Sequence, residues 1–232
     1  MSPLPRRSRS SAPDALTIEA LAKRRLPASF FHRDALLVAR ELVGCALVHR
    51  RRAGMIVETE AYHGPEDAAS HARFGPTART SVMFGPGGIS YVYLCYDIHQ
   101  MFNIVTGREG EGQAVLIRAV APLVGLPDDP GVGRGPGKVT TALALDRRHD
   151  RRDLARGALF VAAHATPPHI ATGPRVGVAY AGEWAARPWR FWWDGHPAVS
   201  RAPAPPPESR SAREPAPARE PRPARRARRE PS

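Results

Sequence analysis

The sequence predicts an α+β fold, a single compact domain around a curved, open-barrel-like antiparallel β-sheet with short helices and one protruding β-hairpin. Strand-like segments outnumber helical ones, and the helical segments are short. The segments also lack the regular strand–helix–strand order that builds a parallel sheet. A length of 232 residues suits one such domain with terminal extensions.

Both ends of the chain differ in composition from its middle. Residues 201–232 hold nine arginines, four glutamates and many prolines and alanines, and residues 1–13 hold three arginines. Such segments bury too little apolar surface to offset the entropy of ordering. We therefore predict a basic, largely disordered segment over 1–25, a folded domain over 26–200, and a disordered tail over 201–232. The tail is either a solubilising appendage or a loose tether to phosphates.

Charge and apolar patterning limit the class of protein. The net charge is +12, but only about +4 belongs to residues 14–200, so charge alone is weak evidence for a nucleic-acid partner. The sequence contains no apolar window long enough for a membrane span and no apolar stretch typical of a secretory signal. Cys45 and Cys95 are too few for an iron–sulfur cluster or a disulfide framework. A reducing cytoplasm fits them best.

Two short helices are predicted before the first strand, each after an aspartate that can cap a helix N-terminus. Asp14 precedes a helix that runs to about Lys23, and Asp34 precedes ALLVAREL, which Gly44 ends. A later helix, GPGKVTTALAL, is entered through a Gly–Pro turn. The predicted strands are, in chain order, CALVHR, GMIVETEAY, the hairpin SYVYLCY and MFNIVT joined by DIHQ, AVLIRAV, RVGVAY and PWRFWW.

The strand GMIVETEAY carries the most informative pattern. Period-2 alternation gives it two faces, one with Val57, Thr59 and Ala61 and the other with Glu58, Glu60 and Tyr62. Two carboxylates and a tyrosine fit a groove, where an aromatic ring stacks on an extruded base and a carboxylate activates water. The pattern also fits a solvated strand face with a surface tyrosine, and both interpretations stand.

The predicted hairpin places Tyr91 and Tyr93 on one face and Tyr96 on the other, close to the turn. A tyrosine at a hairpin tip can enter the base stack and fill the gap left by a flipped nucleotide. Aromatic residues are also common in ordinary strands. Asn103, on the returning strand, would place an amide where it can contact the polar edge of a base.

Arg118 interrupts the apolar strand AVLIRAV. A buried arginine needs a partner, and Glu60 on a neighbouring strand is a candidate, although an outward-facing arginine on an edge strand fits equally well. His71 follows Tyr62 past a GPED turn and forms either a second stacking wall or a structural contact. No histidine or cysteine spacing is typical of a metal site, so we predict neither a metal nor a cofactor.

Seven segments together, in order along the chain, resemble the alkyladenine (3-methyladenine) DNA glycosylase family. The resemblance covers residues 26–200. It is specific because the whole ordered set matches, whereas a single piece such as GPGK is weak. The segments are IVETEAYHGPEDAASHA, MFGPGGISYVYLCY, FNIVTG, AVLIRA, GRGPGKVTTALAL, DLARG and RVGVAYAGEWAARPWRF.

The resemblance implies a role for each matching residue. Glu60 corresponds to the general base that activates water, and Arg118 to the arginine that helps to hold this water. The base pocket is implied to consist of two stacking walls, Tyr62 and His71, a third aromatic, Tyr93, and Asn103, whose amide crowds the exocyclic amine of guanine. Tyr96 corresponds to the intercalating residue. The GRGPGK turn is expected to contact the DNA backbone through Arg134, Gly135, Gly137 and Lys138.

These roles imply base excision repair by a monomer on damaged duplex DNA, in a cytoplasmic, nucleoid-associated location. Alkylated or deaminated purines (3-methyladenine, 7-methylguanine and hypoxanthine) would be flipped out and hydrolysed from the sugar, leaving an abasic site. Lyase activity needs an amine for a Schiff base, and Lys23 and Lys138 are the only lysines. A non-catalytic DNA- or RNA-binding module is the alternative, since DPGVGRGPGKVTTA also resembles a helix–hairpin–helix clamp. The barrel topology also resembles RNA-binding formyltransferase domains.

Asp97 departs from the family pattern, which usually has glycine after the intercalating residue. A tight turn at this position requires a positive φ, which aspartate tolerates less well than glycine. A carboxylate beside the intercalating residue also repels phosphate. We therefore predict weaker flipping or binding than with glycine.

Overall fold

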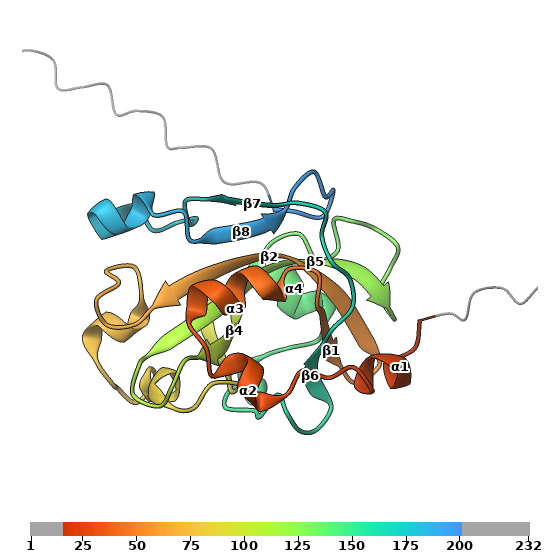
Figure 1. Ribbon diagram of the computed structural model, residues 1–232, viewed down its shortest axis with the longest axis horizontal. Helices are drawn as coiled ribbons and strands as arrows, with labels where there is room; N and C mark the ends of the chain where they lie inside the picture. The colour runs from red at the N-terminus through yellow and green to blue at the C-terminus, as the bar shows by residue number, and fades with distance from the viewer. Residues whose placement is uncertain (1–15, 201–232) are drawn as a thin grey trace, which may run out of the picture. The chain divides into compact units, whose positions relative to one another are not determined.

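The fold is built on an eight-stranded antiparallel sheet (Figure 1). The structure is a computed structural model and describes residues 16–200. The strands are β1 (Ala46–His49), β2 (Arg52–His63), β3 (Ser90–Cys95), β4 (His99–Thr106), β5 (Gln113–Val124), β6 (Leu159–Ala162), β7 (Ile170–Gly173) and β8 (Arg190–Trp193). The main path runs β3-β4-β5-β2-β1-β6, and β8 pairs with β2 and β7. The predicted α+β class around a curved antiparallel sheet is confirmed.

Strand β2 organises the sheet because it pairs along its whole length. β5 lies along one edge, while β1 and β8 share the other edge, β1 beside the first half of β2 and β8 beside the second. The register with β5 shifts on both sides of Glu58, so that Val57 has no partner in the register. A bulge of this kind changes which face a side chain joins. Val57 therefore packs with Met55, and its predicted place on the same face as Ala61 is wrong.

Short helices flank the sheet: α1 (Ile18–Ala22), α2 (Ala28–Phe31), α3 (Ala35–Leu42) and α4 (Pro136–Ala142), with 3-10 helices η1 (His71–Phe74), η2 (Ser81–Phe84), η3 (Arg147–His149) and η4 (Ala179–Ala186). The predicted cap of α3 is confirmed, since Asp34 accepts a hydrogen bond from the Leu36 amide at 2.8 Å. The first helix begins at Ile18 and is capped by Thr17. Asp14 and the segments 1–15 and 201–232, with the tail predicted there, lie outside the described residues.

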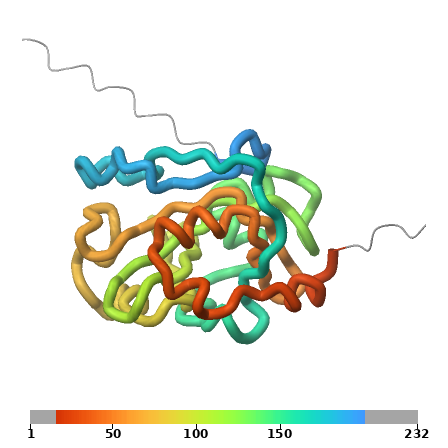
Figure 2. Tube along the Cα trace, in the orientation of Figure 1, coloured from red at the N-terminus to blue at the C-terminus, as the bar shows by residue number. Residues whose placement is uncertain are grey.

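The main apolar core lies between α3 and the sheet. α3 crosses the face of β2 (Figure 1). At this crossing, Thr59 Oγ1 donates to the Ala39 carbonyl at 2.8 Å. The tube in Figure 2 shows the N-terminal helices on one side of the sheet and the β7–β8 pair along its upper edge. None of the helices within residues 16–200 is long and apolar enough to cross a membrane.

One predicted strand is wrong. RVGVAY forms a loop that leads into η4, and the strand that pairs with β8 is β7, which the sequence pattern did not reveal. β8 has both edges occupied, by β2 and β7, so no place remains there for a further strand. The loop instead directs the Val176 amide toward a side chain of β2. β6, which pairs with β1, was also not predicted.

Candidate active site

A cavity of about 360 Å³, called the aromatic cavity below, lies between the second half of β2, the β3–β4 hairpin and the loop before η4. The structure brings together seven residues that the sequence singled out, and all line this cavity: Glu60, Tyr62, His71, Tyr93, Tyr96, Asn103 and Arg118. Among the other lining residues, Tyr91, Val176 and Tyr180 had no predicted role. A volume in this range fits a small-molecule or single-base ligand.

Glu60 is held from three sides at the wall of the aromatic cavity. Its Oε1 accepts a hydrogen bond from the Val176 amide at 2.7 Å and lies 3.3 Å from Arg118 Nη1. Its Oε2 accepts a hydrogen bond from the Tyr62 hydroxyl at 3.0 Å. An ionised carboxylate offers about four acceptor positions, so three protein partners leave one for a water molecule. The carboxylate is therefore fixed in orientation and still able to bind water.

Glu58, the other carboxylate of this strand face, does not line the aromatic cavity, and its predicted place in a groove is wrong. Its Oε1 accepts from Arg190 Nε at 2.6 Å and from Arg118 Nε at 3.0 Å, and its Oε2 accepts from the Ser200 amide at 2.7 Å. A buried carboxylate is tolerated only with such partners. Arg118 thus connects Glu58 with Glu60, and the predicted pairing of Arg118 with Glu60 is confirmed.

Aromatic rings form one side of the cavity. The ring of His71 lies 4.6 Å from that of Tyr93, and Tyr91 and Tyr93 lie 5.2 Å apart, between ring centroids. His71 Nδ1 and the Tyr91 hydroxyl are hydrogen-bonded at 3.0 Å. Burial, helped by Arg79 and Arg73, lowers the pKa of His71 to about 4, and burial raises the pKa of Tyr91 to about 12. These walls are therefore uncharged near neutral pH and suited to stacking on a flat ring.

Tyr62 is supported from behind by an arginine. The guanidinium of Arg175 lies 4.9 Å from the Tyr62 ring centroid and 5.0 Å from the Trp189 ring. Arg175 forms a fully buried ion pair with Asp67, with Nη2 to Oδ1 at 2.8 Å. Burial raises the pKa of Tyr62 well above its ordinary value, so its hydroxyl stays protonated and donates to Glu60. Sequence reasoning missed Arg175 because RVGVAY was interpreted as a strand.

The tip of the β3–β4 hairpin exposes two large apolar side chains. Tyr96 is 88% exposed and Ile98 is 73% exposed. The Ile98 amide donates to the Cys95 carbonyl across a turn whose central residues, Tyr96 and Asp97, have φ of +49° and +55°. Positive φ at both central residues is typical of a type I′ turn. The predicted positive φ at Asp97 is confirmed.

Asn103 lies on β4 opposite Tyr91 and is 3% exposed. Its Nδ2 donates to the Tyr91 carbonyl at 3.2 Å and more weakly to the Met101 carbonyl at 3.4 Å. Within residues 16–200, its amide oxygen accepts no hydrogen bond. The residue therefore places a rigid amide at the cavity wall.

The GRGPGK turn lies at the rim of the aromatic cavity, which Pro136 lines. Gly135 has φ of +115° and directly precedes α4 as its N-cap, and a Cβ on Gly137 would lie 2.9 Å from His99 Nδ1. The Arg134 guanidinium donates to the Pro197 carbonyl, and Lys138 Nζ donates to the Gly131 carbonyl at 3.3 Å. These contacts explain the turn structurally, and its contact with a DNA backbone stays a prediction. No three metal-binding side chains gather anywhere in residues 16–200.

Known proteins resemble this chain over most of its folded part. Residues 29–197 match the family model of methylpurine-DNA glycosylase. A protein of Anaeromyxobacter dehalogenans (strain 2CP-1), named "putative 3-methyladenine DNA glycosylase", is 54% identical over 196 residues, which are 82% of this chain and 90% of that protein. Proteins with the same printed name from Myxococcus xanthus and Legionella pneumophila (strain Corby) are 51% and 43% identical. These matches cover 78% and 77% of this chain and 95% and 99% of those proteins.

Proposed function

The chain belongs to the methylpurine-DNA glycosylase family, and from this premise we propose that it removes damaged purines from duplex DNA by hydrolysis of the N-glycosidic bond. The substrates we propose are 3-methyladenine, 7-methylguanine and hypoxanthine. The product is an abasic site. We also propose that the enzyme acts as a monomer on chromosomal DNA, in a nucleoid-associated cytoplasmic location.

The observation that carries this proposal is the position of Glu60 at the wall of an aromatic cavity. In the proposed step, the oxygen of a water bound to Glu60 forms a bond with C1′ of the flipped nucleotide. The bond from C1′ to N9 breaks, its electron pair stays on the base, and the water proton passes to Glu60. Arg118 holds Oε1 of the Glu60 carboxylate, and Tyr62 holds Oε2.

The lining of the cavity supports selection of alkylated purines. A methylated purine such as 7-methylguanine carries positive charge, and aromatic faces attract cations. Such a base leaves as a neutral molecule, so its release needs no acid. Hypoxanthine must gain a proton as it leaves, and its release therefore depends on an acid that alkylated purines do not require.

Two further residues are proposed to assist base flipping and to exclude normal guanine. Tyr96, exposed at the hairpin tip, enters the stack where the purine leaves it, because a filled gap offsets part of the unstacking energy. Asn103 crowds the exocyclic amine of normal guanine. Its amide nitrogen is held by two carbonyl groups, so it cannot easily turn aside.

We propose that the enzyme lacks lyase activity. A lyase forms a Schiff base through an amine, and neither Lys23 nor Lys138 lines the aromatic cavity. Borohydride trapping on methylated and on abasic duplexes tests this directly. A covalent protein–DNA adduct on either duplex contradicts the water mechanism.

The central experiment is Glu60→Gln, with Glu109→Gln at an exposed position as the matched control. Release of 7-methylguanine is expected to fall by roughly 10²–10⁴-fold in Glu60→Gln, the usual contribution of a general base. Binding to an abasic-site duplex is expected to persist, and the control is expected to behave as the unaltered chain. Duplex binding without release of any damaged base by the unaltered chain would favour the alternative, a non-catalytic DNA-binding module.

A further inference from the structure

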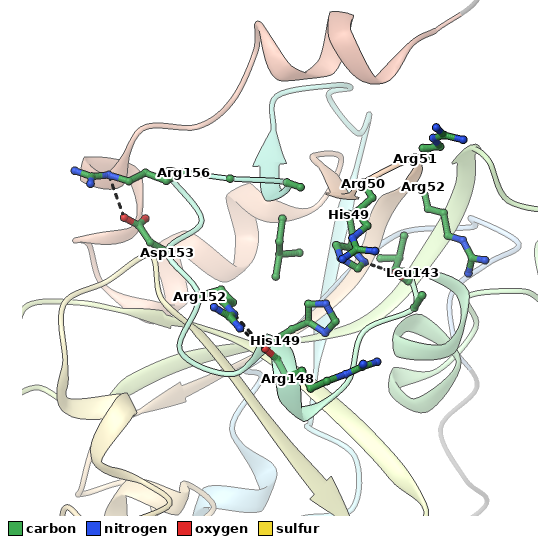
Figure 3. A pocket seen from close by; sticks show the side chains of 14 residues that line it. His49, Arg50, Arg51, Arg52, Leu143, Arg148, His149, Arg152, Asp153 and Arg156 are labelled. Carbon is green, nitrogen blue, oxygen red and sulfur yellow. Dashed lines mark hydrogen bonds and ion pairs between the residues drawn. The ribbon is translucent and has the colours of Figure 1, made fainter.

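A second and larger cavity, of about 870 Å³, lies at the C-terminal end of α4 (Figure 3). It shares no lining residue with the aromatic cavity. The helix connects the two, because Pro136 at its start lines the aromatic cavity and Leu143 just beyond its end lines the second cavity. Seven helical residues span about 10 Å. We call the second cavity the arginine cleft after six lining residues: Arg50, Arg51, Arg52, Arg148, Arg152 and Arg156.

The arginine cleft carries a large excess of positive charge. Its lining contains one carboxylate, Asp153, which pairs with Arg156 at 3.5 Å. Within residues 16–200, the guanidinium groups of Arg50 and Arg51 form no ion pair or hydrogen bond, and both residues are exposed. Cations gathered around a concave surface focus a positive potential that attracts anions. The cleft is therefore a strong candidate for binding an anion.

The floor of the arginine cleft is organised by the helix. His49 Nδ1 lies 2.8 Å from the Leu143 carbonyl, and Arg52 Nη1 donates to the Ala142 carbonyl at 2.8 Å. The C-terminal end of a helix carries partial negative charge, which disfavours an anion nearby. Because His49 and Arg52 contact these carbonyl oxygens, the negative end of α4 is covered by the protein's own donors.

The spacing of the arginines indicates which anion fits. In Figure 3, Arg156 lies on one side of the cleft and Arg51 on the opposite side, with Arg148 and Arg152 between and below them. Groups spread around a rim contact successive phosphates of a chain better than they surround a single phosphate. Arg148 forms an ion pair with Asp146, with Nη2 to Oδ2 at 2.6 Å, and its side chain is 85% exposed.

The remaining lining distinguishes duplex from single-stranded nucleic acid. The cleft has no phenylalanine, tyrosine or tryptophan, so it offers no platform on which unpaired bases can stack. It also has no asparagine or glutamine of the kind that reads base edges. Arginines spread around a rim favour contacts with phosphates, which position a protein on DNA and carry no sequence information.

We propose that the arginine cleft binds the phosphate backbone of duplex DNA, as a sequence-independent site separate from the aromatic cavity. The inference rests on the proposed function only in taking duplex DNA as the substrate. The arginine cleft holds the enzyme on undamaged duplex DNA while the hairpin tip samples bases. Binding at this site releases counterions, so it strengthens affinity at low salt and makes affinity fall more steeply as salt rises.

The test compares two double variants that remove the same charge. Arg50→Asn with Arg51→Gln alters the cleft, and asparagine is chosen at position 50 because φ there is +55°. Arg40→Gln with Arg108→Gln is the control, at exposed positions that line neither cavity. Affinity for a lesion-free duplex is measured from about 50 to 200 mM salt. In a plot of log affinity against log salt concentration, the cleft variant is expected to reduce the steepness of the slope by about 2, one for each lost phosphate contact. The control is expected to leave the slope unchanged.

A second variant and a small-anion probe complete the test. Arg156→Gln, on the opposite side of the cleft, is expected to lower the slope by about 1. Equal slopes in both double variants would overturn the proposal. The proposal would also be overturned if the unaltered chain bound inorganic tripolyphosphate saturably, and the cleft variant lost this binding but kept the same salt dependence of DNA affinity. The site would then bind a small anion rather than DNA. Since lesion-free binding requires no excision, failure of base release by the unaltered chain would refute the proposed function alone.

Discussion

The buried ion pair between Asp67 and Arg175 offers a sharp test of how the loop before η4 supports Glu60. Both side chains are fully removed from solvent, and Arg175 also donates to the Ala61 carbonyl at 2.9 Å. The next residue, Val176, donates its amide to Glu60 at 2.7 Å. Replacing Asp67 by asparagine keeps the shape of the side chain and removes its charge.

Removing one partner of a buried pair costs about 3–5 kcal/mol, because the other charge stays buried without compensation. A domain of this size loses roughly 2–4 °C of Tm for each kcal/mol, so the expected loss is about 6–20 °C. Asp153→Asn is the matched control, since Asp153 pairs with Arg156 at the surface, with side chains 45% and 87% exposed. Exposed pairs typically contribute about 0–1 kcal/mol.

The same variant tests the positioning of Glu60. If the loop shifts, Glu60 loses the Val176 amide, and a hydrogen bond to a charged group contributes about 1.5–3 kcal/mol. The rate of base release is then expected to fall roughly 10-fold or more at a temperature where both proteins stay folded, while duplex affinity stays within about twofold, since the hairpin tip is unchanged. Thermal unfolding and single-turnover release of 7-methylguanine measure the two effects. A Tm for Asp67→Asn no lower than that of Asp153→Asn would refute the reasoning.

Three further outcomes are expected. Tyr96→Ala is expected to leave stability unchanged, because Tyr96 is 88% exposed. It is expected to slow base release from duplex DNA roughly 10-fold or more and to leave release from a single-stranded lesion unaffected. Release rates on the two substrates measure this difference. His71 has a folded pKa of about 4, below its unfolded value of about 6.5, so the unfolded chain binds more protons between these values. Stability therefore falls as pH drops from 6.5 toward 4, and denaturant midpoints should fall less in His71→Gln. Asp97→Gly is expected to raise the affinity for duplex DNA at low salt. Asp97→Asn, which removes only the charge, is expected to give the part of this increase that comes from lost repulsion. Titration that finds unchanged affinity in both variants contradicts the predicted repulsion.

Local signals in the sequence were sufficient for much of the fold. Asp34 caps α3 through hydrogen bonds to amides two and three residues away, so its role depends on nothing distant. The β3–β4 hairpin is likewise set by alternation and a short turn. RVGVAY shows the limit of such signals, because its alternation fits a strand. RVGVAY is excluded from the sheet because β7, which ends at Gly173 just before this segment, already occupies the free edge of β8, and neither RVGVAY nor β7 alone shows which of them takes that edge.

The candidate site shows the same division between local and distant causes. The pairing of Arg118 with Glu60 could be predicted because a charge in an apolar strand requires a partner. The error at Val57 could not be avoided, since the bulge beside it arises from the register between β2 and β5 rather than from β2 alone. Val176 contacts Glu60 and Arg175 contacts the Ala61 carbonyl from a segment more than a hundred residues away, and only folding brings them there.

Glu58 and Glu60 have the same side chain but different surroundings, and the contacts of each decide whether it has a structural role or lines the aromatic cavity. They lie two residues apart on β2, and both are fully buried. Glu58 receives donors from Arg118, Arg190 and Ser200 and has no access to the aromatic cavity. Because Glu58 fixes Arg118 through Nε, the guanidinium turns Nη1 toward Glu60. Arg118 thus contacts both carboxylates, and Glu58, which does not line the cavity, orients the arginine that supports Glu60.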